Sequence, residues 1–392
     1  MDMYPRTINI LKSKSFFLFG ARGTGKTTFL KQFFKAENVL WLDFLKSSDE
    51  ERFSRNPELL YDIIINATHS YDWVVIDEVQ KIPKILDTIH LILESGKTKI
   101  KFALTGSSAR KLKRGTANLL AGRVFSHYFF PFVFSDLESS FDLDKAINYG
   151  MLPTVWVTND EEEIKAYLRS YAELYVKEEV WLEQLIKNLM PFRKFLEVAS
   201  QMSGEIVNYS KIAKQINIDT KTVQNYFLIL EDTLLSFSLE AYHSSVRKRL
   251  ITAPKFYFFD LGVKRALERT LNLKIEKQNF TYGKNFEQFI ISQMFFYNKN
   301  LNFDYKFYFL KTKDGVEIDL IIDRPGTGLL LIEIKSSNQV DKSDLRHLIE
   351  FKKLFSHSEA CCLSNDPFAR TIEDVKVVHW QQGLRELFQI SN

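Results

Sequence analysis

A glycine-rich stretch near the N-terminus constrains this chain more than any other feature. Gly20–Thr27 reads Gly-Ala-Arg-Gly-Thr-Gly-Lys-Thr and fits G-x-x-x-x-G-K-[ST] at every fixed position. The apolar run Phe16–Phe19 precedes it, and Thr28–Phe34 continues with a helical pattern. Glycines at these places let backbone N–H groups and the helix start face phosphate oxygens. The stretch therefore predicts a phosphate-binding loop between a buried strand and a helix.

The chemistry of a bound nucleoside triphosphate assigns roles within this loop. We expect Lys26 to contact the β- and γ-phosphates and the Thr27 hydroxyl to ligate Mg²⁺. The other residues expected to line the nucleotide are Gly20, Ala21, Arg22, Gly23, Thr24, Gly25 and Thr28. ATP and Mg²⁺ are thus the expected cofactors.

Two further apolar strands end in polar residues that suit hydrolysis. Trp73–Ile76 runs into Asp77 and Glu78. We expect Asp77 to join the Mg²⁺ shell and Glu78 to orient or deprotonate the attacking water. The strand that includes Phe102–Leu104 leads to Thr105, whose hydroxyl is expected to touch the γ-phosphate or that water.

Short apolar runs and helical stretches alternate from Ser15 to about Ser135, which indicates a parallel α/β sheet. The strands expected from this pattern are Ser15–Phe19, Asn38–Phe44, Trp73–Ile76 and Lys101–Leu104. An arginine beyond them is a candidate for contacting the phosphates, and the sequence leaves the choice open among Arg123, Arg110 and Arg114.

These motifs together resemble the prokaryotic AAA-type ATPases. The resemblance rests on the loop, on Asp77–Gln80, on Leu104–Ser108 and on Leu119–Arg123. In that family the ATPase domain is fused to a C-terminal region of unknown function. The resemblance implies an AAA+ fold, Mg-ATP binding and a homo-oligomer such as a ring, a hexamer being one option. It also makes Arg123 the best match for an arginine that acts in trans.

A helix-turn-helix pattern follows a helical and aromatic segment. Ser210–Ile216 and Lys221–Glu231 carry apolar residues at helical spacing, and Asn217–Asp219 reads as the turn between them. The apolar residues expected to be buried in the second helix are Val223, Phe227, Leu228 and Leu230, and Thr220 is its expected cap. The pattern predicts two helices joined by a short turn.

Two strands and a basic run come next. Leu234–Tyr242 and Lys255–Phe259 read as strands that flank Arg247-Lys248-Arg249, so the segment predicts a winged helix with a basic wing. DNA is the expected partner, contacted by the wing and by the helix residues Lys221, Thr222, Gln224 and Asn225. A protein–protein module is the alternative, because the excess of positive charge is small.

The last part of the chain gathers carboxylates around a hairpin. Strands on either side of Asp323–Gly328 place Asp319 near Glu333 and Lys335, which share a face because they are two apart. Glu287 opens a preceding helix and is expected as a third carboxylate. Carboxylates so placed predict a site for Mg²⁺ or Mn²⁺, with Lys335 beside it to activate water or steady a phosphate.

This arrangement resembles the PD-(D/E)XK nuclease superfamily, with Ile318-Asp319 in place of Pro-Asp. The resemblance implies an αβββαβ core, framed by the helix that carries Glu287 and a helix over Lys342–Phe355. It makes Asp319, Glu333 and Lys335 candidate catalytic residues for DNA cleavage, while nuclease-like domains also serve as binding modules.

The sequence therefore predicts a four-part α/β protein. The expected parts are an AAA+ P-loop core (1–135), a helical lid or linker (136–188), a winged helix (189–272) and a PD-(D/E)XK-like domain (273–392). One expected function is an ATPase that acts on forked or branched DNA. The alternative is an ATP-switched regulatory module with an idle nuclease fold.

Composition adds the expected setting. Charged residues make up 26% of the chain, which is typical of a globular protein, and no apolar run is long enough for a membrane span. Cys361 and Cys362 are adjacent, so on a strand they point to opposite faces and are poorly placed to bridge each other. A reducing, cytoplasmic location without membrane partners is expected.

Overall fold

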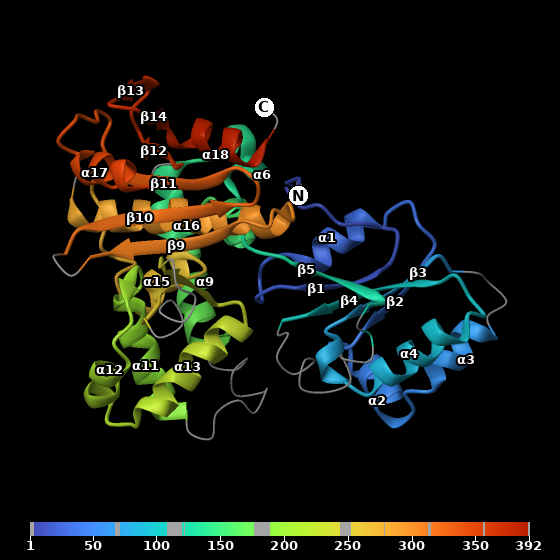
Figure 1. Cartoon of the computed structure of the whole chain (residues 1–392). Coiled ribbons are helices and arrows are strands. Elements are labelled where there is room, and N and C mark those ends of the chain that lie inside the picture. The colour runs from blue at the N-terminus through green and yellow to red at the C-terminus, as the bar shows by residue number, and fades with distance from the viewer. Residues whose placement is uncertain are drawn as a thin grey trace. The chain divides into compact units, whose positions relative to one another are not determined.

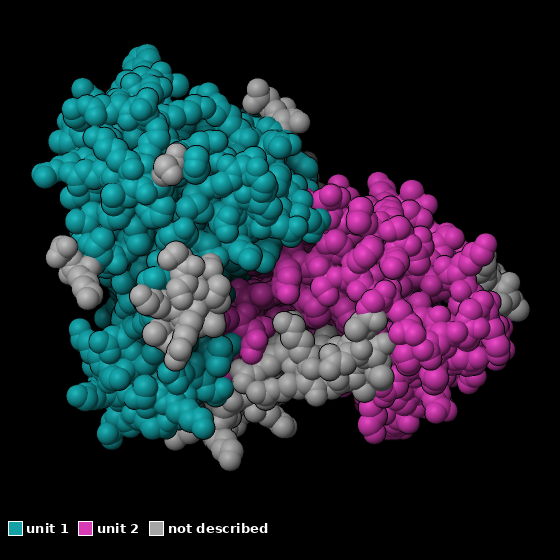
Figure 2. Space-filling model, in the orientation of Figure 1, with its two compact units in different colours: residues 1–7, 132–228, 236–392 teal, residues 8–131, 229–235 magenta. Residues whose placement is uncertain are grey.

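The computed structural model describes residues 4–66, 71–107, 120, 122–175, 189–243, 252–277, 279–312, 315–355 and 357–390. Contacts divide the chain into two compact units, coloured separately in Figure 2. Unit 1 comprises 1–7, 132–228 and 236–392, and unit 2 comprises 8–131 and 229–235. In the described parts of the chain, no helix is both long and apolar enough to cross a membrane.

A parallel sheet forms the centre of unit 2 (Figure 1). Its five strands among the described residues lie in the order β2-β3-β4-β1-β5. Their bounds are β1 (Ser15–Phe19), β2 (Val39–Asp43), β3 (Trp73–Asp77), β4 (Lys101–Gly106) and β5 (Val124–Tyr128). Every pairing in this sheet is parallel, so the carboxyl ends of all these strands meet at one edge.

Apolar side chains cover both faces of this sheet. Along β1, Phe16 and Leu18 pack into one core with Leu30, while Phe17 and Phe19 pack into the other with Ile89. The helices of unit 2 are α1 (Lys26–Phe33), α2 (Ser47–Arg55), α3 (Leu59–Ile65), the 3₁₀ turn η1 (Val79–Lys81) and α4 (Ile85–Ser95). The mixed strand-and-helix pattern thus yields the expected parallel α/β unit.

The four strands expected from apolar runs are confirmed. β1 begins and ends as expected, β2 is one residue shorter at each end, and β3 and β4 run on to Asp77 and Gly106. The fifth strand, β5, was not expected, because Val-Phe-Ser-His-Tyr is only partly apolar. It lies at the edge of the sheet, where one row of backbone groups has no neighbouring strand, and most of its side chains are incompletely buried.

Between β5 and β6 the chain of unit 1 forms a series of helices. They are α6 (Phe134–Leu137), η3 (Glu138–Ser140), α7 (Leu143–Tyr149), α8 (Pro153–Val157), α9 (Glu161–Ser170), η4 (Tyr171–Tyr175) and α11 (Leu189–Gln201). α9 begins at the acidic run Glu161–Glu163, and its cap is Asp160, whose carboxylate accepts from the Glu163 N–H at 2.8 Å. Acidic side chains are favourable in a first helical turn because the helix dipole is positive there.

The expected helix-turn-helix is present as α12 (Tyr209–Ile216) and α13 (Thr220–Asp232). Asp219 rather than Thr220 caps α13, since its carboxylate accepts the Thr222 N–H at 2.9 Å. The ring of Phe227 packs against Phe195 of α11 and against Phe256, which fixes α13 on its neighbours. Leu228, expected to be buried, is 54% exposed.

Antiparallel strands complete this segment. β6 (Glu205–Ile206) pairs with β8 (Lys255–Phe258), and β8 pairs with β7 (Ser236–Ala241). β7 then pairs in parallel with β9 (Lys306–Lys311), at Glu240 and Tyr308. The expected boundary at residues 272/273 is therefore crossed by one continuous sheet, and contacts place 136–228 and 236–392 in the same unit.

The sheet of unit 1 has nine strands within the described residues, in the order β13-β14-β12-β11-β10-β9-β7-β8-β6. The strands not yet named are β10 (Glu317–Arg324), β11 (Gly328–Lys335), β12 (Glu359–Ser364), β13 (Arg370–Ile372) and β14 (Val375–His379). The accompanying helices are α15 (Leu261–Leu267), α16 (Phe280–Asn300), α17 (Arg346–Leu354) and α18 (Trp380–Phe388). From α16 to β12 the order is helix, three strands, helix and strand (Figure 1).

The hairpin β10–β11 lies at the centre of this sheet. Its antiparallel pairing runs from Arg324/Gly328 at the turn to Leu320/Ile332. α17 packs on one face through Leu348 and Ile349, which share a core with Leu331 of β11. The pairing of β10 with β9 shifts register between Ile318 and Ile321, so the sheet is irregular beside Asp319.

Candidate functional site

The glycine-rich loop follows β1 at the carboxyl edge of the sheet in unit 2. Gly23 and Gly25 have φ values of 77° and 93°, a region where a side chain is strained. A Cβ on Gly20 would lie 2.3 Å from the Phe129 carbonyl oxygen, so only glycine fits there. Gly25 is also the N-cap of α1, which directs the first N–H groups of that helix into the loop. The loop therefore has the shape that binding of phosphate oxygens requires.

The Lys26 side chain folds back over this loop. Its ammonium donates to the carbonyl oxygens of Gly20 at 2.6 Å and Ala21 at 3.3 Å. Thr24 is fully buried and donates to the same Ala21 carbonyl, whereas Thr28 lies exposed on α1. Lys26 is thus poised at the loop, and a phosphate there would accept from the same ammonium.

Asp77 is the junction of a hydrogen-bond relay at the sheet edge. Its Oδ2 accepts from the Thr27 hydroxyl at 2.6 Å, and its Oδ1 accepts from the Thr105 hydroxyl. The Thr105 oxygen in turn accepts the Glu78 N–H at 2.9 Å. Strand order explains the meeting, because β3 and β4 are neighbours and β4 pairs with β1. Thr27 and Asp77 are the hydroxyl and carboxylate expected to share Mg²⁺.

Thr105 lies deeper than the sequence suggested. It is completely buried, and its hydroxyl is engaged by Asp77 and by the Glu78 backbone. The Thr105 hydroxyl thus supports Asp77 from behind, and its expected contact with a phosphate or a water stays a prediction. A buried hydroxyl with both a donor and an acceptor partner holds those groups in place.

Gln80 is a residue whose role sequence reasoning missed. Its amide nitrogen donates to Glu78 Oε2 at 2.5 Å and to the Ser107 hydroxyl at 3.0 Å. Glu78 itself has a left-handed backbone, with φ of 59°, at the end of β3. The signal in the sequence is a glutamine two residues after the glutamate, on the turn η1. Gln80 fixes the direction of the Glu78 carboxylate.

Arg123 lies at the opposite edge of the same sheet. It precedes β5, whose first residue Val124 pairs with Ser15 at the start of β1, whereas the loop follows the end of β1. Its guanidinium contacts Glu94 at 2.6 Å. A strand of this length spans about 16 Å, so Arg123 is out of reach of the loop in its own unit. The other two candidates, Arg110 and Arg114, lie outside the described residues.

Unit 1 contains a cavity of about 530 Å³ at the end of the β10–β11 hairpin. The expected carboxylates Glu287, Asp319 and Glu333 all line it. Further charged groups on its wall are Glu205, Lys255, Lys284, Lys311 and Glu317, and the imidazole of His347 also lines it. The structure thus brings residues of α16, β8, β9, β10, β11 and α17 to one place, although they are far apart in sequence.

Asp319 and Glu333 lie just beyond the last pair of the hairpin, Leu320 and Ile332, at the end away from the turn. Asp319 Oδ2 accepts the Ile334 N–H at 2.7 Å, so a side chain takes the place of a backbone acceptor where the strands separate. Burial, and then the charges of Glu333 and Glu287, raise the pKa of Asp319 well above its usual range. Burial likewise raises the pKa of Glu333. Both shifts show that negative charge is unfavourable in this cavity.

Glu333 and Glu287, two of the expected carboxylates, each form an ion pair with a lysine. Lys335 contacts Glu333 Oε1 at 2.7 Å, while Glu333 Oε2 is buried and has no hydrogen-bond partner among the described residues. Glu287 is paired with Lys255 at 3.1 Å. Within the part of the chain that is described, no three His, Cys, Asp or Glu residues form a group able to hold a metal ion. The three expected carboxylates therefore form no such group among the described residues, and Glu287 is paired with Lys255.

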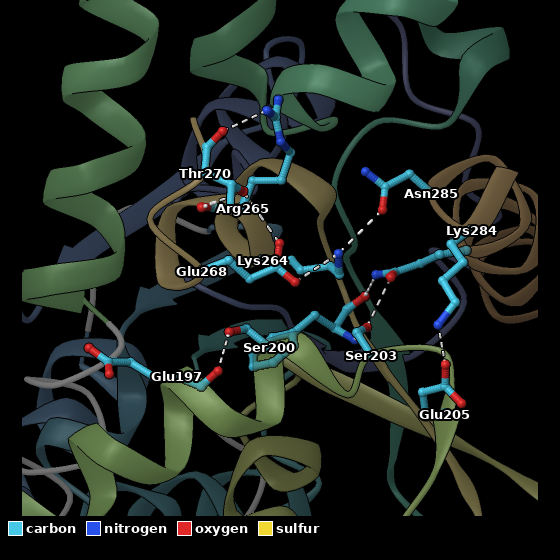
Figure 3. A network of polar contacts seen from close by, with 12 residues as sticks. Glu197, Ser200, Ser203, Glu205, Lys264, Arg265, Glu268, Thr270, Lys284 and Asn285 are labelled. Atoms are coloured by element: carbon cyan, nitrogen blue, oxygen red, sulfur yellow. Dashed lines mark hydrogen bonds and ion pairs between the residues drawn. The ribbon is translucent and has the colours of Figure 1, made fainter. Parts of the chain in front are cut away.

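Figure 3 shows polar contacts that join α16, the helix that carries Glu287, to α15 and β6. The buried ammonium of Lys264 contacts Glu268 at 3.0 Å and donates to Asn285 of α16 at 3.2 Å. Lys284, one residue earlier on α16, pairs with Glu205 of β6. These contacts join α15, α16 and β6, so the position of Glu287 depends on the segment before it as well as on α16.

The residues expected to touch DNA lie on α13. Lys221 and Gln224 are exposed, and Thr222 and Asn225 are partly exposed. The expected basic wing, Arg247-Lys248-Arg249, lies outside the described residues. DNA contact by this helix stays a prediction.

Three family models match successive parts of the chain. Residues 12–138 match an AAA domain, residues 140–278 match a domain of unknown function (DUF8612), and residues 282–382 match another domain of unknown function (DUF4143). The first of these covers the glycine-rich loop, the Asp77 relay and the five-stranded sheet. The second and third divide unit 1 between β8 and α16.

The chain is similar in sequence to three curated proteins that are each named only as an uncharacterized protein. One from Mycobacterium bovis and one from Mycobacterium tuberculosis are each 22% identical, over 79% of this chain and 67% of theirs. One from Methanocaldococcus jannaschii is 26% identical, over 85% of this chain and 78% of its own.

A solved structure, domain III of the Thermotoga maritima replication initiation protein DnaA, aligns over 57% of this chain and 85% of its own, at 16% identity. Its TM-score of 0.22 carries no argument about this chain. The sequence match and the geometry of the loop agree that residues 12–138 are similar to an AAA domain, which is followed by two matches to domains of unknown function.

Proposed function

We propose that this chain binds Mg-ATP at Gly20–Thr27, hydrolyses it, and couples the cycle to DNA. The observation that carries the ATPase part is the relay from Thr27 through Asp77 and Thr105 to the Glu78 backbone. It joins a loop built for phosphates to the carboxylates that hydrolysis requires.

Each residue of the relay has a separate task in this proposal. Lys26 would neutralise phosphate charge, and Thr27 with Asp77 would hold Mg²⁺, which supplies charge stabilisation at the phosphates. Glu78, directed by Gln80, would accept a proton from the attacking water or orient it. Arg123, out of reach of its own loop, would serve the loop of a neighbouring copy in a ring, a hexamer being one option.

DNA is proposed as the partner of unit 1 for two reasons. The order α11-β6-α12-α13-β7-β8, with β6 and β7 both paired to β8, agrees with the order expected of a winged helix. The exposed Lys221 and Gln224 lie on α13, the second helix of the helix-turn-helix, which would contact the major groove of DNA. The order from α16 to β12 likewise agrees with a PD-(D/E)XK core.

Metal-dependent cleavage is proposed for the cavity of unit 1. Asp319 and Glu333 fit one divalent cation, because Glu333 Oε2 is buried without a hydrogen-bond partner and both carboxyl groups carry raised pKa values. Mg²⁺ or Mn²⁺ would supply Lewis acidity there. Lys335, already beside Glu333, would face the phosphate of the substrate.

Cleavage of labelled forked DNA with and without Mn²⁺ tests this part. We expect Mn²⁺-dependent products from the parent chain, and none from Asp319→Asn or Lys335→Ala, while both variants keep ATP hydrolysis. Lys376→Ala is a matched control, because this lysine pairs with Glu386 and lines a different cavity. Products from Asp319→Asn equal to those of the parent would refute the nuclease assignment.

A regulatory module that binds DNA or protein without cutting is the second candidate. The ion pair between Lys255 and Glu287 favours it, since that pair leaves no three-carboxylate group among the described residues. In this case Asp319→Asn should change DNA affinity and its dependence on salt, and no metal-dependent product should form with any variant.

A further inference from the structure

Lys255 is an unusual lysine, because it is almost completely buried and has two carboxylate partners. Its ammonium lies 3.1 Å from Glu287 Oε1 and 2.6 Å from Glu317 Oε1, and its side chain is 5% exposed. The two carboxylates come from α16 and β10, whereas Lys255 begins β8. A charge removed from water in this way is tolerated only when it is paired.

Four of the carboxylates that line the cavity fall into two pairs, and the other one, Glu205, contacts Lys284. Asp319 and Glu333 lie at the end of the hairpin, and Glu333 retains a buried oxygen without a hydrogen-bond partner. Glu287 and Glu317 share Lys255 instead, and Glu317 Oε2 also accepts from Lys311 at 3.0 Å. Tyr257, which lies on the same strand as Lys255, has its hydroxyl 3.5 Å from Glu287 Oε1.

We propose that the Lys255 ammonium occupies the position of a second cation, between Glu287 and Glu317. This inference rests on the proposed metal site at Asp319 and Glu333. The cavity then takes one divalent cation, at Asp319 and Glu333, rather than two. The segment that begins β8 thereby becomes part of the site, and one monovalent positive charge replaces a second metal ion. Lys255 is a positioning residue in this proposal, because it sets where Glu287 and Glu317 lie and does not contact the reacting atoms.

The stoichiometry of Mn²⁺ binding tests the proposal directly. All chains carry Asp77→Asn and no nucleotide is added, so that the loop of the ATPase domain does not contribute. Free Mn²⁺ is counted by electron paramagnetic resonance. We expect one bound Mn²⁺ per parent chain and two in Lys255→Met, in which the ammonium shared by Glu287 and Glu317 is absent. Adding Glu317→Gln to Lys255→Met should return the count to one.

Lys264→Met is the matched control. Lys264 is equally buried in unit 1 and pairs with one carboxylate, Glu268, but it does not line the cavity. Both variants should melt at lower temperature than the parent in EDTA, because each leaves a carboxylate unpaired. Mn²⁺ should restore the melting temperature of Lys255→Met and leave that of Lys264→Met low. A purely structural role for Lys255 predicts no such difference.

The outcomes separate the two proposals. One Mn²⁺ in both the parent and Lys255→Met, or two in the parent, would overturn the role of Lys255 and leave the metal site standing. No Mn²⁺ in the parent would instead refute the metal site itself. If Lys255→Met does not fold even with Mn²⁺, Lys255→Arg decides, since it keeps the positive charge: one Mn²⁺ is expected, and two would contradict the proposal.

Discussion

The Thr27 hydroxyl donates a hydrogen bond of 2.6 Å to the Asp77 carboxylate, which links the glycine-rich loop to the end of β3. Thr105 accepts the Glu78 N–H and donates to the other oxygen of Asp77, so the two acidic residues are held from behind by one side chain. The geometry of the proposed catalytic edge thus depends on a threonine that is itself fully buried.

Replacing this threonine should weaken both stability and turnover. Thr105→Val keeps the shape but removes the hydroxyl, at a cost of about 1–3 kcal/mol in the free energy of unfolding, because a buried carboxylate loses a donor. ATP turnover should fall while nucleotide affinity stays within a few-fold. Urea unfolding and steady-state kinetics measure the two effects.

Thr88→Val controls for the substitution itself. Thr88 is equally buried in unit 2, but its hydroxyl donates at 3.3 Å to the neutral Pro57 carbonyl, so a smaller loss of stability and unchanged turnover are expected. Equal effects of both variants on turnover would argue against a specific role for Thr105.

Nucleotide affinity should depend on Lys26. Lys26→Ala removes the ammonium poised over the loop, and a charge-assisted contact with phosphate is worth about 1.5–3 kcal/mol, or a tenfold or greater rise in Kd. Titration with a fluorescent ATP analogue gives the Kd. Lys31→Ala, at an exposed position of the same helix, should bind like the parent. Unaltered binding by Lys26→Ala would remove Lys26 from the site.

The pH dependence of stability should report the crowded carboxylates of unit 1. The pKa of Asp319 is raised in the folded chain, so the folded state binds more protons than the unfolded state above about pH 4. In EDTA, stability should therefore fall as pH rises from there through the raised pKa. Asp319→Asn removes this loss and should be more stable than the parent near neutral pH.

Asp260, another buried acid of unit 1, contributes in the same direction. Burial raises the pKa of Asp260 to about 6, so the difference between parent and Asp319→Asn, measured by urea unfolding across pH, is the informative quantity. A difference that does not change with pH would contradict the raised pKa of Asp319.

The sequence alone predicts the loop of unit 2 better than the cavity of unit 1. The loop, Asp77 and Glu78 could be located because their spacing is local and the strands before them are continuously apolar. Edge strand β5 could not, since its exposed positions break the pattern. The depth of Thr105 was equally hidden, because it depends on β4 lying next to β3 in the sheet.

Long-range pairing explains what was missed in unit 1. Asp319, Glu333 and Lys335 could be grouped from a hairpin, which is a local structure. Lys255 belongs to the site only because β8, β7 and β9 continue the same sheet, a connection that no sequence spacing reveals. Glu287 lines the same cavity as Asp319 and Glu333, but its ion pair with Lys255 could not be foreseen.

Arg123 should act only on a neighbouring copy, since it lies at the far edge of its own sheet. Lys26→Ala and Arg123→Ala chains should each be inactive alone. Mixed, they should regain part of the ATP turnover, because some shared sites pair an intact loop with an intact arginine. Arg52→Ala, which changes another arginine of unit 2, should need no such complementation. Absence of recovery at every mixing ratio would rule out Arg123 as the shared residue.

The central claim is that Glu78, held at the end of β3, carries ATP hydrolysis in the AAA domain. Its most direct test is steady-state ATP turnover with Mg²⁺ by the parent chain and by Glu78→Gln, without DNA and with duplex, forked or four-way DNA. We predict turnover by the parent that rises with DNA. For Glu78→Gln we predict a loss of about 10²–10⁴-fold with ATP still bound, as expected when a general base is removed. Turnover by Glu78→Gln at the parent rate would contradict the account.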